Sequence, residues 1–182
     1  IEAAMMAANI APGMNRSFTA EEWTHIIPKK AWYQAIEEAN DNIREDVQLS
    51  IQGYDMDGDI IKVARENARN AGVEEYIHFQ QRPMQELRHP KKYGFIITNP
   101  PYGERLEDKA DMPKLYKEIG ETFGALDSWS YFLITGYEDA QKYIGKKATK
   151  NRKIYNGMMK TYFYQYMGPK PPKREKEQKE ER

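Results

Sequence analysis

Four consecutive residues, Asn99-Pro100-Pro101-Tyr102, combine an amide, two rigid rings and an aromatic face. An exocyclic amine of a nucleobase is a weak nucleophile, because its lone pair is delocalised into the ring. Carbonyl oxygens that accept from its two N–H groups would favour a pyramidal nitrogen and stabilise the positive charge that grows as it attacks a methyl group. The side-chain oxygen of Asn99 and the backbone carbonyl of Pro100 could be those two acceptors.

The same four residues are well suited to hold a fixed shape. Each proline fixes its own φ and disfavours the helical region for the residue before it, which keeps Asn99 and Pro100 extended. Tyr102 offers a flat face to a base flipped out of its stack, a contact worth about 1–3 kcal/mol. Asn-Pro and Pro-Pro dipeptides also mark ordinary turns, which is the alternative interpretation of this segment. The position after a buried strand and downstream of an acidic strand end favours the chemical interpretation.

A second candidate site lies at Asp55 and Met56, which follow a short predicted strand. An acidic side chain at the carboxyl end of a strand can accept from both hydroxyls of a cofactor ribose, and Met56 could then cover the adenine. Helix capping is the alternative role for Asp55. For Asp57, two residues further on, capping is the preferred interpretation.

Basic residues provide the candidate contacts to a polyanion. The segment 145–153 carries Lys146 and Lys147 and has no acidic residue, so it could bind RNA phosphates in a salt-sensitive way. A solvated loop remains the alternative. Arg105, close to the Asn99 segment, is predicted to contact the substrate.

Composition limits the remaining possibilities. The 182 residues contain 28 basic and 28 acidic side chains, so any surface that binds a polyanion must be a local patch. The three histidines show no metal-ligand spacing, and we predict no metal site. The absence of cysteine excludes disulfides and fits a reducing compartment, and the apolar runs are too short to span a bilayer. We expect a cytoplasmic protein that does not enter a membrane.

Hydrophobic periodicity predicts the elements that position these residues. Helices are expected at 1–11, 31–44, 113–126 and 137–144, with another that Asp57 caps and Gly72 ends. Strands are expected at 49–54, 76–80, 93–98 and 129–135, followed by a hairpin of 153–155 and 160–167 around Asn156-Gly157. The helix at 31–44 has one apolar face, and the strand at 93–98 is apolar enough to be covered on both faces. The alternation predicts an α/β fold with a mostly parallel sheet and an antiparallel terminal hairpin, in which ligands bind beyond the carboxyl ends of the strands.

The chain resembles the THUMP-domain ribosomal RNA guanine-N2 methyltransferases, whose catalytic domain is a class I, Rossmann-like methyltransferase. The segments that carry the resemblance are 1–4, 53–57, 99–106 and 146–157. It implies S-adenosyl-L-methionine as cofactor and methylation of N2 of a guanine in RNA, with 23S ribosomal RNA as the expected substrate. It also implies that Asp55 binds the cofactor ribose, and that Asn99 to Tyr102 hold the guanine and line the methionine end of the cofactor.

Three parts of the family pattern are missing from the sequence. The glycine-rich cofactor loop and the strand before it should precede Ile1, as should a THUMP-type RNA-binding region. We therefore expect residues 1–167 to be a partial catalytic domain that binds cofactor poorly alone, with a gap in its sheet between 49–54 and 93–98. Residues 168–182 are expected to be a flexible charged tail. A further departure is at 81–84, where many class I methyltransferases place an aspartate that recognises adenine.

Other functions remain open at this stage. Asn-Pro-Pro-Tyr alone would also suit an amine methyltransferase acting on adenine in DNA or on a guanine in transfer RNA. The absent glycine-rich loop leaves room for a non-catalytic RNA-binding module on the same fold. A nicotinamide-dependent enzyme would use Asp55 to bind the ribose, but the sequence lacks the Gly-x-Gly-x-x-Gly fingerprint of that class.

Overall fold

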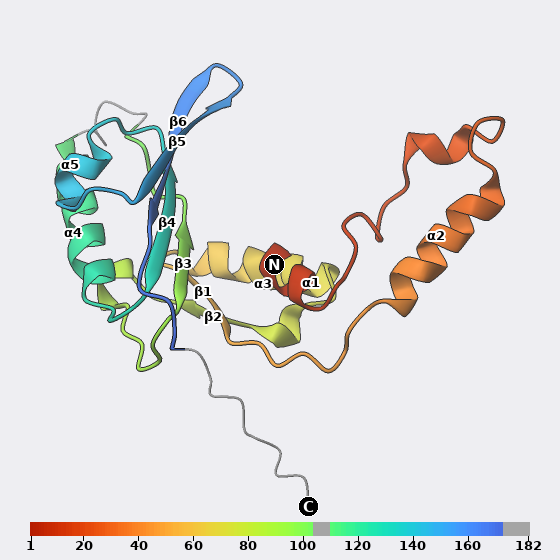
Figure 1. Cartoon of the computed structure of the whole chain (residues 1–182), viewed down its shortest axis with the longest axis horizontal. Helices are drawn as coiled ribbons and strands as arrows, with labels where there is room; N and C mark the ends of the chain where they lie inside the picture. The colour runs from red at the N-terminus through yellow and green to blue at the C-terminus, as the bar shows by residue number, and fades with distance from the viewer. Residues whose placement is uncertain (104–109, 173–182) are drawn as a thin grey trace, which may run out of the picture. The chain divides into compact units, whose positions relative to one another are not determined.

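The computed structural model describes residues 1–103 and 110–172, which divide into two compact units (Figure 1). The first unit ends at Pro83 and the second begins at Met84. Each unit has its own core.

The first unit pairs two parallel strands with helices. Strand β1 (Ile51–Asp55) lies beside β2 (Ile77–Gln81), with Asp55 opposite Gln81 at their carboxyl ends. The helices are α1 (Glu2–Ala7), α2 (Lys29–Asp41) and α3 (Gly58–Asn70), with short 3-10 turns at Thr19–Glu22 and Glu74–Tyr76. The buried core consists of Ala4, Ala68, Val73 and Ile77. It joins α1, α3 and the start of β2.

Helix α2 is confirmed as a helix, but its apolar face is not buried. Its apolar residues recur at helical spacing, yet none of its residues is buried, and Ile36 is 37% exposed. The periodicity therefore predicts the helix but not which segment covers its apolar face. The amphipathic pattern needs a tertiary partner, and none of the core residues of this unit comes from α2.

The second unit is a four-stranded sheet with helices. Its strands are β3 (Phe95–Thr98), β4 (Ser130–Thr135), β5 (Lys150–Asn156) and β6 (Met159–Tyr166), in the order β3-β4-β6-β5. The β3–β4 pair is parallel, and the other two pairs are antiparallel. Helices α4 (Met112–Gly124) and α5 (Ala140–Ile144) and a 3-10 turn at Met84–Glu86 complete the unit. Its core joins these two helices to β4 and β6.

The strand β3 differs from its prediction. Ile96 packs against the core of the second unit, but Phe95 and Ile97 point the other way and are 68% and 79% exposed. The apolar run predicted burial on both faces, and within this unit only one face of β3 is buried. The three rings of Phe95, Phe132 and Phe163 form a row across β3, β4 and β6, with centroids 6.3 and 6.2 Å apart.

The predicted α/β architecture is confirmed, including the antiparallel hairpin at the end of the chain (Figure 1). The element ends shift by a few residues: α1 and α5 are shorter than expected, and β5 begins three residues before Lys153. The described strands form two sheets, with β1 and β3 in different ones. A further strand upstream of Ile1 stays a prediction. No helix in the described ranges is long and apolar enough to cross a membrane.

Candidate functional site

The turn after β3, residues 99–103 (the Asn99 turn), exposes an amide oxygen on a rigid stretch of backbone. Asn99 follows the strand directly and is exposed, Pro100 is buried, and Gly103 closes the turn at φ 72°, in the left-handed region that glycine adopts without strain. The Tyr102 hydroxyl donates to the Asn99 side-chain oxygen over 2.5 Å. That oxygen has two lone pairs, so one remains for another donor.

A buried hydroxyl network holds this turn against the rest of the unit. The Tyr116 hydroxyl on α4 donates to the backbone carbonyl of Pro101 over 3.0 Å and is also hydrogen-bonded to the Thr135 hydroxyl at the end of β4. Because Tyr116 has one proton and gives it to Pro101, Thr135 must be the donor in the second bond. Thr135 in turn accepts from the backbone N–H of Tyr137. Helix α4, strand β4 and the start of the loop after β4 are thereby tied to the Asn99 turn.

Burial controls the ionisation of Tyr116. Its side chain is fully buried, and desolvation of the phenolate raises its pKa from 10.0 to about 12. The hydroxyl therefore stays protonated at neutral pH and can keep donating to Pro101.

An open cavity of about 420 Å³ lies beside Tyr102. Its lining residues come from the Asn99 turn, the loop after β4 and the hairpin: Tyr102, Gly103, Gly136, Tyr137, Glu138, Asp139 and Met159. The Tyr102 ring lies so close to Gly136 that an added Cβ there would be 3.1 Å from its Cδ2 atom. The cavity thus has an aromatic wall, a methionine on the hairpin side and carboxylates at its rim.

Glu138, which lines the cavity, forms an ion pair with Lys160 on β6. The Lys160 Nζ atom is 2.8 Å from the Oε1 atom of Glu138, and the Tyr162 hydroxyl is 3.5 Å from the same oxygen. The hydrogen bond and the charge of Lys160 lower the pKa of Glu138, and the same hydrogen bond raises the pKa of Lys160. Lys153 on β5 adds to the effect on Glu138. Both groups are charged at neutral pH.

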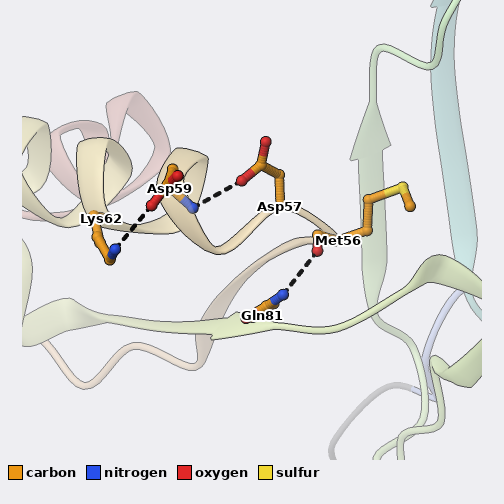
Figure 2. A network of polar contacts seen from close by, with 5 residues as sticks. All are labelled: Met56, Asp57, Asp59, Lys62 and Gln81. Atoms are coloured by element: carbon orange, nitrogen blue, oxygen red, sulfur yellow. Dashed lines mark hydrogen bonds and ion pairs between the residues drawn. The ribbon is translucent and has the colours of Figure 1, made fainter.

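In the first unit, the end of β1 turns into α3 at Met56 and Asp57 (Figure 2). The backbone N–H of Asp57 donates to the Oδ1 atom of Asp55 over 2.9 Å. Asp57 caps α3 by accepting from the backbone N–H of Asp59 over 2.8 Å, which confirms its predicted role. Met56 between them is 75% exposed, and its side chain is free to cover a ligand.

Gln81 supports this turn from β2 (Figure 2). Its amide donates to the carbonyl of Met56 over 3.0 Å, and its side-chain oxygen would be 2.8 Å from a Cβ added at Gly58. Arg82, next in the chain, has its guanidinium 5.6 Å from the centre of the Tyr54 ring. Within the segment 81–84, where many class I methyltransferases place an adenine-reading aspartate, Gln81 thus has an amide that holds the backbone of the β1–α3 turn.

The predicted substrate-binding cations are placed differently from one another. Lys146 has its ammonium 5.8 Å from the centre of the Tyr131 ring, near the start of β4, whereas the Asn99 turn follows the opposite end of the neighbouring strand. The four residue steps along β4 from Tyr131 to Thr135 correspond to about 13 Å, so Lys146 lies well away from the Asn99 turn. Lys147 is exposed. Arg105 lies outside the described residues.

Sequence reasoning missed four residues of this site: Tyr116, Thr135, Glu138 and Lys160. The first two were interpreted only as parts of a helix and a strand, because their hydroxyls meet through tertiary packing. A signal for Glu138 was present, since it lies just after a strand that ends at the predicted ligand-binding edge. Within residues 1–103 and 110–172, no group of three or more acidic or histidine side chains is placed to hold a metal ion.

Comparison with known proteins identifies relatives of the whole described part of the chain. Residues 1–165 match the family described as "RMKL-like, methyltransferase domain". YpsC of Bacillus subtilis (strain 168), named a candidate RNA methyltransferase, is 41% identical over 176 residues, which are 97% of this chain and 46% of YpsC. Ribosomal RNA large subunit methyltransferase K/L of Shewanella baltica (strain OS185) is 35% identical over 171 residues, 91% of this chain and 24% of that protein. The chain thus spans less than half the length of these relatives.

Solved structures agree with this family assignment. A candidate methylase from Clostridium difficile 630 superposes with a TM-score of 0.89 at 51% identity, over 94% of this chain and 45% of the other. SMU.472, a candidate methyltransferase in complex with SAH, gives 0.88 at 42% identity over the same shares. A protein of Listeria monocytogenes str. 4b F2365, described as a predicted N6-adenine-specific DNA methylase, gives a TM-score of 0.84 at 42% identity, over 92% of this chain and 43% of the other.

Proposed function

Because the chain belongs to the RMKL-like methyltransferase domain family, we propose that it is part of an S-adenosylmethionine-dependent enzyme that methylates N2 of a guanine in RNA. The fold is that of the class I methyltransferases. The observation that carries the proposal is the Asn99 turn, which presents an exposed amide oxygen on a braced backbone beside an open cavity.

The residues of this turn match the needs of an exocyclic amine. Asn99 Oδ1 and the carbonyl of Pro100 would accept from the two N–H groups and so direct the nitrogen lone pair away from the ring plane. The Tyr102 hydroxyl occupies one lone pair of Asn99, which fixes the amide orientation and leaves the second lone pair for the substrate. S-adenosylmethionine, when bound, supplies an electrophilic methyl group to the attacking nitrogen. The charge that develops on the amine would be stabilised by these two oxygens.

The end of β1 fits the ribose of this cofactor. The Oδ1 atom of Asp55 is held by the N–H of Asp57, which orients the carboxylate and leaves its second oxygen for a sugar hydroxyl. Met56, exposed beside it, would cover the adenine. The side-chain nitrogen of Gln81 donates to the Met56 carbonyl, which leaves its side-chain oxygen as the acceptor at this position. Adenine recognition at Gln81 would therefore use its oxygen or backbone groups.

RNA is the proposed substrate because two curated relatives have names that refer to RNA, one of them to large-subunit ribosomal RNA. Lys146 and Lys147, away from the Asn99 turn, would contact phosphates remote from the target base. Arg105 remains a proposed substrate contact. An upstream THUMP-type region would supply further RNA affinity.

One alternative has a specific observation in its favour. The relative from Listeria monocytogenes is described as acting on adenine in DNA. Both reactions would use the Asn99 turn in the same way, because each methylates an exocyclic amine. The identity of the labelled nucleoside separates them.

The test uses the full-length protein with tritiated S-adenosylmethionine and undermodified ribosomal RNA. Wild type is compared with Asn99→Ala and with Asn67→Ala, which removes an exposed amide on α3 as a matched control. We expect label in N2-methylguanosine with wild type and Asn67→Ala. We expect a loss of about 100-fold or more with Asn99→Ala, the scale of removing one charge-stabilising group. Cofactor binding should survive.

Two outcomes would contradict the proposal. Label in N6-methyladenosine, with DNA preferred over RNA, would favour the adenine methylase. No label on any nucleic acid, together with no cofactor bound by the full-length protein, would leave a binding module.

A further inference from the structure

We propose that Glu138 and Lys160 read the Watson–Crick edge of the flipped base and select guanine. This inference rests on the proposed function and adds the residues that set its base specificity. The pair joins the loop after β4 to the hairpin strand β6, and its Glu138 lines the cavity beside Tyr102.

The pair presents a donor and an acceptor side by side. Lys160 Nζ is 2.8 Å from the Oε1 atom of Glu138, and both described contacts of this carboxylate use Oε1. Within the described residues, its Oε2 atom therefore remains available as an acceptor. The Lys160 ammonium has three N–H groups and donates one of them to Glu138. A ligand at the rim would meet one cation donor next to one carboxylate oxygen.

The edge of guanine complements this arrangement. Its O6 atom is an acceptor, and the adjacent N1 atom carries a proton, so O6 can accept from Lys160 while N1–H donates to Glu138. The N2 amine follows N1 on the same edge. A base read in this way would have its amine next along the edge, where the Asn99 turn can accept from it.

The same two residues would reject a base with the opposite pattern. A 6-aminopurine places N–H groups against the ammonium and an N1 lone pair against the carboxylate. Both contacts then become repulsive, and reversed polar contacts of this kind discriminate more strongly than the loss of an apolar contact. Asp139, also on the cavity rim, adds negative charge that favours a donor edge.

The cavity walls are consistent with a purine. The Tyr102 ring forms one wall, and Met159 on β6 contributes an apolar surface. A volume of about 420 Å³ lies within the range of small-molecule sites. The polar groups at the rim are then left to distinguish one purine from another.

The test compares two bases that share the reacting amine. After the methylated position has been mapped, synthetic RNAs carry either guanine or 2,6-diaminopurine at that position. Both have the N2 amine, but diaminopurine has an amine at C6 and an unprotonated N1. The ratio of kcat/KM for the two RNAs is measured with the full-length protein, for wild type, Glu138→Gln, Lys160→Gln and the double variant.

We expect wild type to prefer guanine by roughly 100-fold, since two contacts are reversed in diaminopurine. An amide can offer either a donor or an acceptor, so the double variant should reduce this preference by about 10-fold or more. Each single variant should reduce it less. The control is the exposed pair Lys117–Glu121 on α4, at 3.8 Å, changed to Lys117→Gln and Glu121→Gln. It removes the same charges and should leave the ratio unchanged.

The outcomes separate this inference from the proposed function. An unchanged ratio in folded variants that still methylate guanine would overturn the role of Glu138 and Lys160 and leave the function intact. Equal activity of wild type on both RNAs would also overturn it. No methylation of the guanine RNA by wild type would overturn the proposed function and the inference together. Thermal unfolding of every variant identifies any loss that comes from misfolding, and each single variant then replaces a double variant that does not fold.

Discussion

At the scale of single residues, Gly136 determines where the Tyr102 ring can lie. A Cβ at this position would be 3.1 Å from the Cδ2 atom and 3.5 Å from the Cγ atom of Tyr102. The separation from Cδ2 is tighter than ordinary contacts, and the ring would have to move by a few tenths of an ångström. The same ring carries the hydroxyl that holds Asn99. A small displacement would therefore reach the group proposed to orient the amine.

We expect Gly136→Ala to reduce kcat/KM for methyl transfer by about 10-fold, because small misplacements at a reacting centre are costly. Its free energy of unfolding should change by less than about 1 kcal/mol, since the tyrosine is only partly buried. The measurement pairs methyl transfer with urea unfolding. Gly124→Ala serves as control, because an added Cβ at Gly124 would have no neighbour within 4 Å. Full activity of Gly136→Ala would show that the ring position is not critical.

At the scale of elements, helices α4 and α5 approach each other at Gly120. A Cβ there would be 2.3 Å from the backbone oxygen of Ile144 and 3.0 Å from its Cα atom. Backbone atoms at the end of α5 cannot rotate away as a side chain can. The glycine is thus required for the packing that brings α5 and its preceding loop to the cavity.

We expect Gly120→Ala to destabilise the protein by about 1–3 kcal/mol through overpacking, even though alanine is the better helix former. Gly124→Ala, four residues on in the same helix, should be neutral or stabilise by up to about 1 kcal/mol. Urea unfolding of both variants gives the comparison. A Gly120→Ala protein as stable as wild type would mean that α5 can shift without loss.

At the scale of the whole molecule, buried tyrosines link stability to alkaline pH. Burial raises the pKa of Tyr116 to about 12 and also raises the pKa values of Tyr131, Tyr164 and Tyr166. A pKa that is higher in the folded state favours the protonated form there. Above the ordinary value of 10.0, the unfolded chain loses protons that the folded chain keeps, so stability decreases as pH rises.

We expect the free energy of unfolding to be constant with respect to these groups below pH 10 and to fall between about pH 10 and 12. The Tyr116 contribution alone would be about 2–3 kcal/mol. Urea unfolding across this range measures it. Tyr116→Phe should flatten the decrease and lower stability at neutral pH by about 1 kcal/mol, because the Pro101 carbonyl loses its donor. Tyr155→Phe, on an exposed ring, should change neither. A decrease as steep in Tyr116→Phe as in wild type would contradict the assignment.

The sequence predicts the α/β order of elements, the Asp57 cap and the place of the Asn99 turn after a strand. These features depend on local periodicity, proline geometry and capping, which neighbouring residues encode. It did not determine burial: α2 forms without a buried residue, and Phe95 and Ile97 are exposed, because coverage depends on distant segments. Nor did it reveal that Lys146 lies near the start of β4, away from the Asn99 turn, or that Lys160 bonds to Glu138, 22 residues away. Side chains from separate elements become neighbours only when the sheet register and helix packing are set, so only the tertiary structure decided how the cavity rim is charged.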